Sequence, residues 1–578
     1  MIRPALILVA LACAFHAECL RAAAPDAFDL QAAVANLQPG AVLELPPGVH
    51  RLPRAGWRLA GLRGVIIDGH GATLIAGSRE TSSLQIDGCD GLTIRNLRID
   101  YDPLPFTQGD IASVDAQAGT ITVQLHAGYP GSEAAASTGG FFTDARLQLF
   151  DRDTPTLKPG APDYGVASLD PAGDRTVRVS FPKWQTGLDF LTVGDRVTLS
   201  SRAAEGVSIR NSREVTLEDV TILAAPNVAI VVRSCETGGT YRRVCVIPGP
   251  PPQGATQPRL ISACADGLNV ANTRLGPVVE QCEFAYQADD AINFHGAMIP
   301  VLKWIDDRSF LSVLPWRNNR LEVIARPGDA IRFLAPPSYE VEGAANIVKI
   351  EKTPEPVEPW LERVGKTWEM LKVNPESVTF YRVTLDQRPP GVQAGGFCEI
   401  PATSTSGFLI RDTYCHDHRG RGFRLMASDG LVVNNRFERI KGCAISLGAE
   451  FSYWREAGWS RNLVVSGNQI RDVGQGWNIR QPDSYTIGAI SIMARTDAGA
   501  APAFPGNENI VLEGNLIDGC SVAGISISNA HNVRVSRNTI RNVNQDASGE
   551  AGRARGLSTT QPISIIRAEA TLSDNLVP

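Results

Sequence analysis

The sequence predicts an all-β fold, a right-handed parallel β-helix with two small inserted antiparallel β-barrel domains. The 578 residues include 54 glycines and 38 prolines, a composition typical of a chain with many turns. Short apolar strands recur at a nearly fixed step, which is 23 residues from Asn515 to Asn538. Repeats of this length predict a solenoid in which each unit packs on its neighbours.

Two strand patterns alternate along the repeat. The first has the form apolar-x-apolar-x-x-Asn-x-apolar and occurs at 92–96, 431–437, 463–470, 510–517 and 533–540. The second places one outward polar residue between two inward apolar residues, at 268–270, 292–294, 423–425, 445–447, 490–492 and 525–527. Several short strands per unit, stacked unit on unit, predict a parallel β-helix. We expect the stacked asparagines to satisfy one another's amides, which is a structural role.

Two stretches interrupt the repeat and divide the chain. They alternate apolar and polar residues between Gly/Pro turns and lack the asparagine pattern, so each predicts an inserted barrel. Helical spacing from Phe28 to Leu37 predicts a helix that covers the open end of the β-helix. The segments are 1–24 (signal peptide), 25–100 (N-terminal cap and first coils), 101–203 (first barrel), 204–297 (coils with the aspartates described below), 298–395 (second barrel) and 396–578 (C-terminal coils).

The composition describes an ordinary globular chain and excludes several functional classes. Hydrophobic residues make up 43% and charged residues 20%, which excludes a disordered chain. The net charge of −6 argues against nucleic acid as a partner. After the N-terminus no apolar run approaches about 18 residues, so we expect no membrane span.

The N-terminus predicts export. Arg3 precedes an apolar stretch, and small residues follow at 22–24 in an A-x-A arrangement. We therefore expect a secreted or periplasmic protein with a bacterial-type signal peptide. Cys235 and Cys245 could form a disulfide in such a compartment. We favour the alternative, in which cysteines fill inward positions as small hydrophobic residues.

Three aspartates are predicted to converge at one edge of the helix. Residues 265–270 align with residues 289–294 at a constant offset of 24. Because one coil advances the helix by about 4.8 Å, Asp266 is expected nearly above Asp290, with Asp289 beside them. Stacked like charges destabilise one another, so such a cluster indicates a use. Strand alternation leaves open whether one of the aspartates points into the core.

Glycoside chemistry supplies such a use. One carboxyl must be protonated to release the leaving oxygen, while another, ionised, acts on water or on the anomeric carbon. Mutual repulsion separates the pKa values of two such carboxyls. This chemistry requires no cofactor and no metal. The alternative interpretation is a structural cluster that is satisfied internally or bridged by calcium.

Several segments together resemble a known family. They are 100–109, 259–266, 280–284, 289–296, 419–422 and 450–456. These segments resemble glycoside hydrolase family 110, the inverting exo-acting α-1,3-galactosidases. The resemblance implies a substrate that is an oligosaccharide or glycoconjugate with terminal α-galactose. It also implies that Asp266, Asp289 and Asp290 carry the acid–base chemistry, and we expect the general acid to be Asp289 or Asp290.

Further polar and aromatic residues are candidates for substrate contact. They are Asn269, Asn293, His295, Arg419, Arg421, Arg424, Glu450 and Trp454. Guanidinium groups suit ring hydroxyls, and apolar sugar faces stack on aromatic rings. The alternative for the arginines is a ladder paired with carboxylates, and the aromatic rings could simply pack their loop. The run 415–418, Cys-His-Asp-His, lacks a further ligand, so we predict no metal site there.

Two other functions stay open at this level. A calcium-dependent polysaccharide lyase is also compatible with aspartates on a β-helix, with an arginine as its base. A non-catalytic glycan-binding β-helix is the third alternative, although it needs no stacked carboxylates. The sequence leaves open whether the protein is a homodimer and which aglycone it accepts.

Overall fold

The computed structural model describes most of the chain. The described residues are 28–131, 145–314, 320–370, 372–475, 487–497, 501–545 and 561–578. The predicted signal peptide, residues 1–24, lies outside them. Within the described part, every helix is too short or too polar to cross a membrane.

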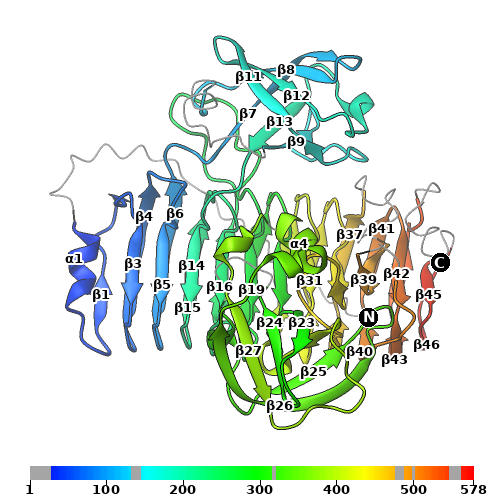
Figure 1. The fold of residues 1–578 in the computed structure, drawn as a ribbon. Coiled ribbons are helices and arrows are strands. Elements are labelled where there is room, and N and C mark those ends of the chain that lie inside the picture. The colour runs from blue at the N-terminus through cyan, green and yellow to red at the C-terminus, as the bar shows by residue number, and fades with distance from the viewer. Residues whose placement is uncertain are drawn as a thin grey trace, which may run out of the picture.

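Two parallel sheets build the predicted β-helix (Figure 1). In the described residues the first has 20 strands: β1 Val42–Glu44, β2 Val49–Arg51, β4 Ile66–Ala76, β6 Thr93–Tyr101, β15 Thr216–Ile222, β17 Thr240–Arg242, β18 Cys245–Val246, β20 Val278–Glu280, β21 Glu283–Ala285, β29 Leu409–Arg411, β30 Tyr414–His416, β32 Gly430–Val433, β33 Arg436–Glu438, β36 Arg461–Ser466, β37 Gln469–Val473, β40 Asn507–Glu513, β41 Leu516–Cys520, β43 Ala530–Ser536, β44 Thr539–Arg541 and β46 Ala570–Ser573. The second has 11: β3 Trp57–Ala60, β5 Leu84–Asp87, β14 Val207–Arg210, β16 Ile230–Arg233, β19 Leu268–Ala271, β22 Ile292–His295, β31 Phe423–Leu425, β34 Ile445–Leu447, β38 Gly488–Ile492, β42 Ala523–Ser528 and β45 Ile563–Ile566. The β-helix prediction is therefore confirmed.

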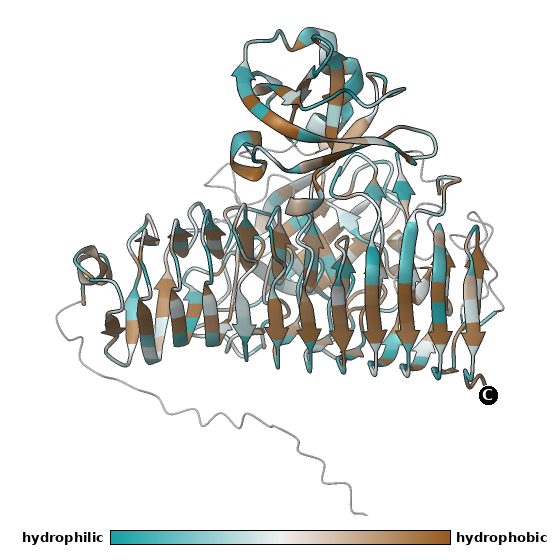
Figure 2. Ribbon diagram, turned by 90° about the horizontal axis from the view of Figure 1, so that it is seen from below, coloured by the Kyte–Doolittle hydropathy of each residue, from teal (hydrophilic) through white to brown (hydrophobic). Residues whose placement is uncertain are grey.

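Inward-facing apolar residues fill the β-helix. Ile230, Leu268 and Ile292 stand in register on successive strands of the second sheet, and all three are fully buried. Side chains alternate between the two faces of a strand, so the residues between them point outward. Repetition of this pattern gives one continuous apolar core along the stack, whose strands appear largely brown in Figure 2.

A ladder of asparagines supports one turn of every C-terminal coil. The Nδ2 atoms of Asn468 and Asn515 each donate to the Oδ1 of the next asparagine along the stack, at 2.9 Å. Asn435, Asn538 and Asn575 extend the ladder in both directions. Buried amides are thereby satisfied without water, as the structural interpretation of the repeat predicts.

The first insertion is an antiparallel sheet above the β-helix in Figure 1. Its elements are β7 Phe106–Asp115, β8 Thr120–Leu125, β9 Arg146–Phe150, β10 Tyr164–Gly165, β11 Ser168–Gly173, β12 Thr176–Ser180, η1 Leu188–Phe190 and β13 Arg196–Ser200. The strands pair in the order β10-β9-β13-β7-β8-β12-β11 and enclose a separate apolar cluster. In the described residues the outer strands β10 and β11 do not pair with each other, so the sheet is open there where the sequence predicted a barrel.

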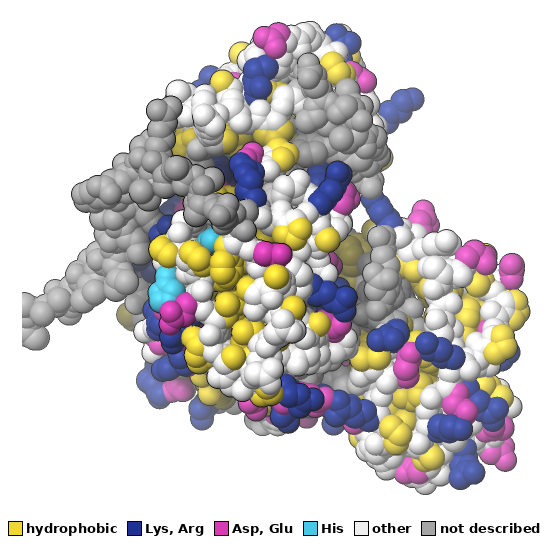
Figure 3. Space-filling model, turned by 90° about the vertical axis from the view of Figure 1, so that its left-hand side faces the viewer, with side chains coloured by type: hydrophobic (Ala, Val, Ile, Leu, Met, Phe, Trp, Pro, Cys, Tyr) yellow, Lys and Arg dark blue, Asp and Glu magenta, His cyan; other side chains and the backbone are white. Residues whose placement is uncertain are grey.

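The second insertion is a closed barrel. Its elements are β23 Ile299–Trp304, β24 Ser309–Val313, α3 Leu321–Ile324, β25 Ala330–Leu334, β26 Val341–Thr353, η2 Glu358–Trp360, α4 Leu361–Met370, η3 Pro375–Ser377, β27 Phe380–Leu385, β28 Phe397–Glu399 and η4 Pro401–Thr403. Strand β28 pairs with both β23 and β25 and so closes the ring. This strand lies beyond the predicted end at residue 395, because sequence alternation does not show where the closing strand stops. Figure 3 shows the barrel as a lobe beside the helix, with acidic and basic side chains interspersed.

The N-terminal end and the cysteines follow the prediction. Helix α1, Leu30–Ala35, lies at the end of the stack, and the Trp57 indole donates to the Leu30 carbonyl at 2.9 Å. Asp29 caps the helix by accepting from two backbone N–H groups. None of the nine cysteines in the described residues forms a disulfide, Cys235 and Cys245 included, and all but Cys245 are buried.

The ladder makes a stability prediction. Asn515→Ala should lower the free energy of unfolding by about 2–4 kcal/mol, because buried partners on both neighbouring coils lose hydrogen bonds. The measurement is urea unfolding followed by circular dichroism. The control is Asn532→Gly at an exposed asparagine, which donates to Asn509 and whose φ of +50° suits glycine. For this variant we expect the free energy of unfolding to change by less than about 0.5 kcal/mol. Equal losses in the two variants would contradict the structural role of the buried ladder.

Candidate active site

The three predicted aspartates lie together at the start of two neighbouring strands. Asp266 precedes β19, and Asp289 and Asp290 precede β22. Leu268 pairs with Ile292 in parallel register, which is the predicted offset of 24. One carboxylate oxygen of each aspartate lies within 4.8 Å of the other two. The stack that the sequence predicts is present.

A bend before each strand decides where these side chains point. Asp266 Oδ2 accepts from Nδ2 of Asn269 at 2.7 Å, and Asp290 Oδ2 accepts from Nδ2 of Asn293 at 3.4 Å. The carboxylates therefore lie on the outward side, with the asparagines, and not in the apolar core. Gly267 fits this bend because a Cβ there would lie 2.6 Å from the Ala291 carbonyl oxygen.

Arg421 binds Asp290 through three hydrogen bonds. Its Nε and backbone N–H donate to Oδ1 at 2.7 and 2.9 Å, and its Nη2 donates to Oδ2 at 2.5 Å. Only 1% of Asp290 is exposed. A buried carboxyl group is tolerated when a guanidinium satisfies both oxygens in this way, so Arg421 fixes Asp290 in its buried position.

Asp289 is also held by arginine, but from two directions. Arg419 Nη1 donates to Oδ1 at 2.9 Å, and Arg202 forms an ion pair with Oδ2. Burial by itself would raise the pKa of Asp289, but the positive charges of Arg419 and Arg202 outweigh it and hold the pKa below its usual range. Asp289 is therefore ionised.

Asp266 has the opposite electrostatic environment. Burial raises its pKa, the charges of Asp289 and Asp290 raise it further, and the result is about 7. Its carboxyl accepts a hydrogen bond from an amide, that of Asn269. The cluster thus combines an ionised Asp289 with a carboxyl that keeps its proton near neutrality, which is the arrangement that acid–base catalysis uses.

Outward positions of the second sheet extend the site along the stack. Asn269, Asn293 and Arg424 stand in register on β19, β22 and β31. The Oδ1 atoms of both asparagines are buried and accept no hydrogen bond within the described residues. Buried acceptors without donors carry a free-energy cost, so a ligand with hydroxyl groups would be stabilised here. Arg424 donates to Ser446 Oγ at 3.1 Å.

His295 and Glu450 occupy the adjacent positions. Burial lowers the pKa of His295 to about 3, so the ring is neutral, and its Nδ1 lies 2.8 Å from the Gly296 carbonyl oxygen. Glu450 lies in β35 (Glu450–Phe451), which pairs with β39 (Arg495–Thr496). Its Oε2 is 3.7 Å from Nη2 of Arg424. Trp454 follows on the same loop, with its ring centroid 5.2 Å from that of Tyr453. Its place in a substrate wall stays a prediction.

Four further charged residues lie at the site, although the sequence motifs did not indicate them: Arg202, Asp163, Glu456 and Arg233. Arg202 comes from the chain leaving the first insertion, and Asp163 comes from within it. Burial and, next, the charge of Glu450 together raise the pKa of Glu456 to about 8. Burial lowers the pKa of Arg233, on β16, to about 10, although the charges of Glu205, Asp266 and Glu456 oppose this. Of these four residues, Glu456 alone could have been predicted, because it lies in the segment 450–456 that resembles the family.

The aspartates are the one group of three metal-binding side chains in the described residues. All four oxygens of Asp289 and Asp290 already accept from guanidinium groups. A cation would have to displace these donors and approach three arginines, so the site fits a metal poorly.

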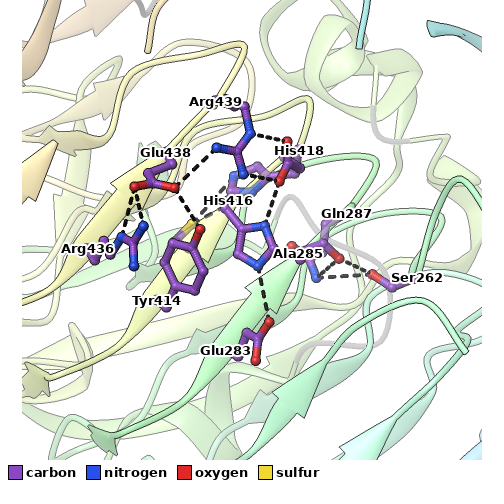
Figure 4. Close-up of polar contacts among 12 residues, drawn as sticks. Ser262, Glu283, Ala285, Gln287, Tyr414, His416, His418, Arg436, Glu438 and Arg439 are labelled. Atoms are coloured by element: carbon purple, nitrogen blue, oxygen red, sulfur yellow. Dashed lines mark hydrogen bonds and ion pairs between the residues drawn. The ribbon is translucent and has the colours of Figure 1, made fainter. Parts of the chain in front are cut away.

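The Cys-His-Asp-His run does not converge on a metal either (Figure 4). His416 lies between Asp417 and Glu283, with its Nδ1 at 2.7 Å and its Nε2 at 3.1 Å from their carboxylates. His418 is instead fully buried, with Nε2 2.9 Å from the Arg421 carbonyl oxygen. Both ring nitrogens of His416 are therefore used within the protein.

The chain is similar in sequence to curated bacterial proteins. It is 23% identical over 548 residues to Alpha-1,3-galactosidase B of Akkermansia muciniphila, covering 88% of this chain and 63% of that relative. It is 24% identical over 432 residues to the protein of the same name from Parabacteroides distasonis, covering 72% of this chain and 66% of that relative. The chain thus spans less than two thirds of the length of either relative. It matches no protein-family model.

Solved structures align over most of the chain at low similarity. The A-module of a mannuronan C-5 epimerase from Azotobacter vinelandii is 10% identical with a TM-score of 0.35, over 95% of this chain and 92% of that one. The family 28 exopolygalacturonase of Yersinia enterocolitica is 10% identical with a TM-score of 0.37, over 94% and 74%.

Proposed function

We propose that this chain, a relative of the alpha-1,3-galactosidases whose family the sequence resembles, is an exo-acting glycoside hydrolase. Its reaction is the removal of terminal α-1,3-linked galactose from glycans. One observation carries the proposal: three carboxyl groups lie within 4.8 Å of one another, and the pKa of Asp266 is raised whereas that of Asp289 is lowered. Glycoside hydrolysis requires a protonated and an ionised carboxyl at one bond.

The ion pairs favour one division of roles among the aspartates. Asp266, with a pKa of about 7, is the proton donor to the leaving oxygen. Asp289 and Asp290, both bound by arginine, orient the attacking water, and the ionised Asp289 accepts its proton. The sequence alone favoured Asp289 or Asp290 as the acid, but Arg419 and Arg202 hold the pKa of Asp289 below its usual range, and Arg421 occupies both oxygens of Asp290.

The substrate contacts follow from the outward ladder. A galactose ring presents several hydroxyl groups, which can donate to the buried Oδ1 atoms of Asn269 and Asn293. Arg424 and Glu450 lie on the following coils, where they can bond further hydroxyls. The neutral ring of His295 can accept or donate one more hydrogen bond.

The second candidate function is the calcium-dependent lyase. The observation in its favour is the spacing of the three aspartates, each of which offers one oxygen to a common point. The arginines that bind Asp289 and Asp290 weigh against it. A purely glycan-binding role gives no reason for stacked carboxylates. Export through residues 1–24 and a homodimeric state stay predictions.

Stereochemistry tests the mechanism. We expect inversion. Every oxygen of Asp289 and Asp290 accepts a hydrogen bond from an arginine, so these carboxyl groups are better suited to hold a water molecule than to attack the anomeric carbon. Inverting pairs are usually about 6.5–9.5 Å apart and retaining pairs about 5 Å, so the close cluster makes the outcome informative. Proton NMR of the first-formed sugar should show β-galactose from an α-linked substrate. α-Galactose, or a trapped glycosyl-aspartate, would rule out inversion.

The pH profile tests the role of Asp266. Its carboxyl must be protonated, so kcat/KM on a terminal α-galactoside should fall as pH rises through about 7. Asp266→Asn should abolish this limb together with most of the activity. Circular dichroism at each pH controls for unfolding. A rate that increases between pH 6 and 8 would show that Asp266 acts as a base.

Metal removal separates the two candidate enzymes. Hydrolysis of terminal α-galactosides should survive dialysis against EDTA, since no step requires a metal. The matched assay uses a uronate polymer with and without Ca²⁺. Calcium-restored activity with an unsaturated product that absorbs in the ultraviolet would instead establish the lyase.

A further inference from the structure

The first inserted sheet forms an ion pair with Arg419 of the candidate active site through Asp163. Asp163 directly precedes β10 and forms an ion pair with Nη2 of Arg419. Nη1 of the same guanidinium donates to Asp289 at 2.9 Å. Arg419 is therefore fixed between a carboxylate of the inserted sheet and a carboxylate of the cluster.

A second cation of the β-helix fixes Asp163 in turn. Nζ of Lys441 lies 3.3 Å from Asp163 Oδ1 and 3.2 Å from the Pro162 carbonyl oxygen, and only 7% of the lysine side chain is exposed. Nearby, the Gly160 N–H donates to the Gln475 carbonyl at 2.7 Å. The segment around Asp163 thus docks on the C-terminal coils through several polar contacts at once.

Positive charge is crowded on this side of the cluster. Arg146 on β9 and Arg202 both contribute to the field at Asp289, together with Arg419 and Arg421. The repulsion of Arg202 and, next, burial lower the pKa of Arg146 to about 10. Asp163 is the anion from the inserted sheet that opposes this crowding. Removal of its charge would leave Arg419 with Asp289 as its ion-pair partner, which Arg202 also binds.

We propose that the inserted sheet completes the active site, and that Asp163 is a positioning residue that holds Arg419 against Asp289 and balances the arginines around it. The inference rests on the proposed glycosidase function. Asp163 touches no reacting atom, so it acts through Arg419. A misplacement of a catalytic group by about 1 Å costs up to about 100-fold in rate, which sets the size of the effect.

The proposal also predicts the sign of a pH effect. Loss of a negative charge near the cluster stabilises the ionised form of every remaining carboxyl, so the pKa of Asp266 must fall. The groups that face Asp266 or Asp163 are Asp289, Asp290, Arg146, Arg202, Arg233, Arg419, Lys441 and Glu456. All of them are unchanged in the variants below.

The experiment compares Asp163→Asn, Asp163→Glu and a matched control, Asp170→Asn. Asp170 lies on the outer strand β11, and its described contact is with Ser168 Oγ at 3.0 Å. Asp163→Asn should lower kcat/KM about 10- to 100-fold and move the alkaline limb of the pH profile down by roughly half a unit. Asp163→Glu should recover both, and Asp170→Asn, with the same charge change, should alter neither.

Several outcomes would overturn the proposal. Loss of activity in Asp163→Asn with an unmoved pH limb, or equal effects in the control, would reduce Asp163 to a structural contact. Carboxyl ¹³C NMR with Asp-labelled protein gives a readout that needs no activity, with the Asp266 signal assigned through Asp266→Asn. Its titration should shift down in Asp163→Asn even if wild-type protein fails on α-galactosides. That failure would reject the proposed function alone, whereas an unshifted titration would reject the role of Asp163.

Discussion

The structure depends on the neutralisation of carboxylates that the parallel register forces together. Successive coils are one strand spacing apart, so aspartates at equivalent positions must stack. Repulsion would destabilise the two coils unless cations were supplied. Arg421, from the coil that follows, binds both oxygens of Asp290, and Arg419 binds Asp289. The arginine-rich coil is thus the electrostatic complement of the aspartate coils, which is one of the two roles that the sequence leaves open for these arginines.

Neutralisation is uneven, and the unevenness provides the chemistry. The guanidinium groups bind Asp289 and Asp290 directly, whereas Asp266 receives only an amide hydrogen bond from Asn269. Burial and the charges of Asp289 and Asp290 outweigh the opposing effects of Arg202 and Asn269 on Asp266, so its proton is retained near neutrality. In the proposed mechanism, the position of the arginines therefore decides which carboxyl donates.

The β-helix and its insertions contribute differently to the site. Strands of the helix fix the spacing of the aspartates and of the outward ladder, because their backbones are paired on both sides and their inward residues are fully buried. The first insertion contributes charge, through Arg202 and Asp163. The rigid repeat thereby supplies geometry, and a less regular element supplies the electrostatic environment.

The sequence by itself determined the features that repeat locally. The offset of 24 residues between Asp266 and Asp290, the asparagine ladder and the cap helix all follow from patterns within one or two coils. The tertiary structure decided the rest. Bends at Asp266 and Asp290 turn both carboxyls outward, against strict strand alternation. Arg202 and Asp163 meet partners 87 and 256 residues away, and no local pattern encodes such contacts. The raised pKa of Asp266 and the lowered pKa of Asp289 depend on burial and on charges that the fold brings together, so the sequence by itself could not separate them.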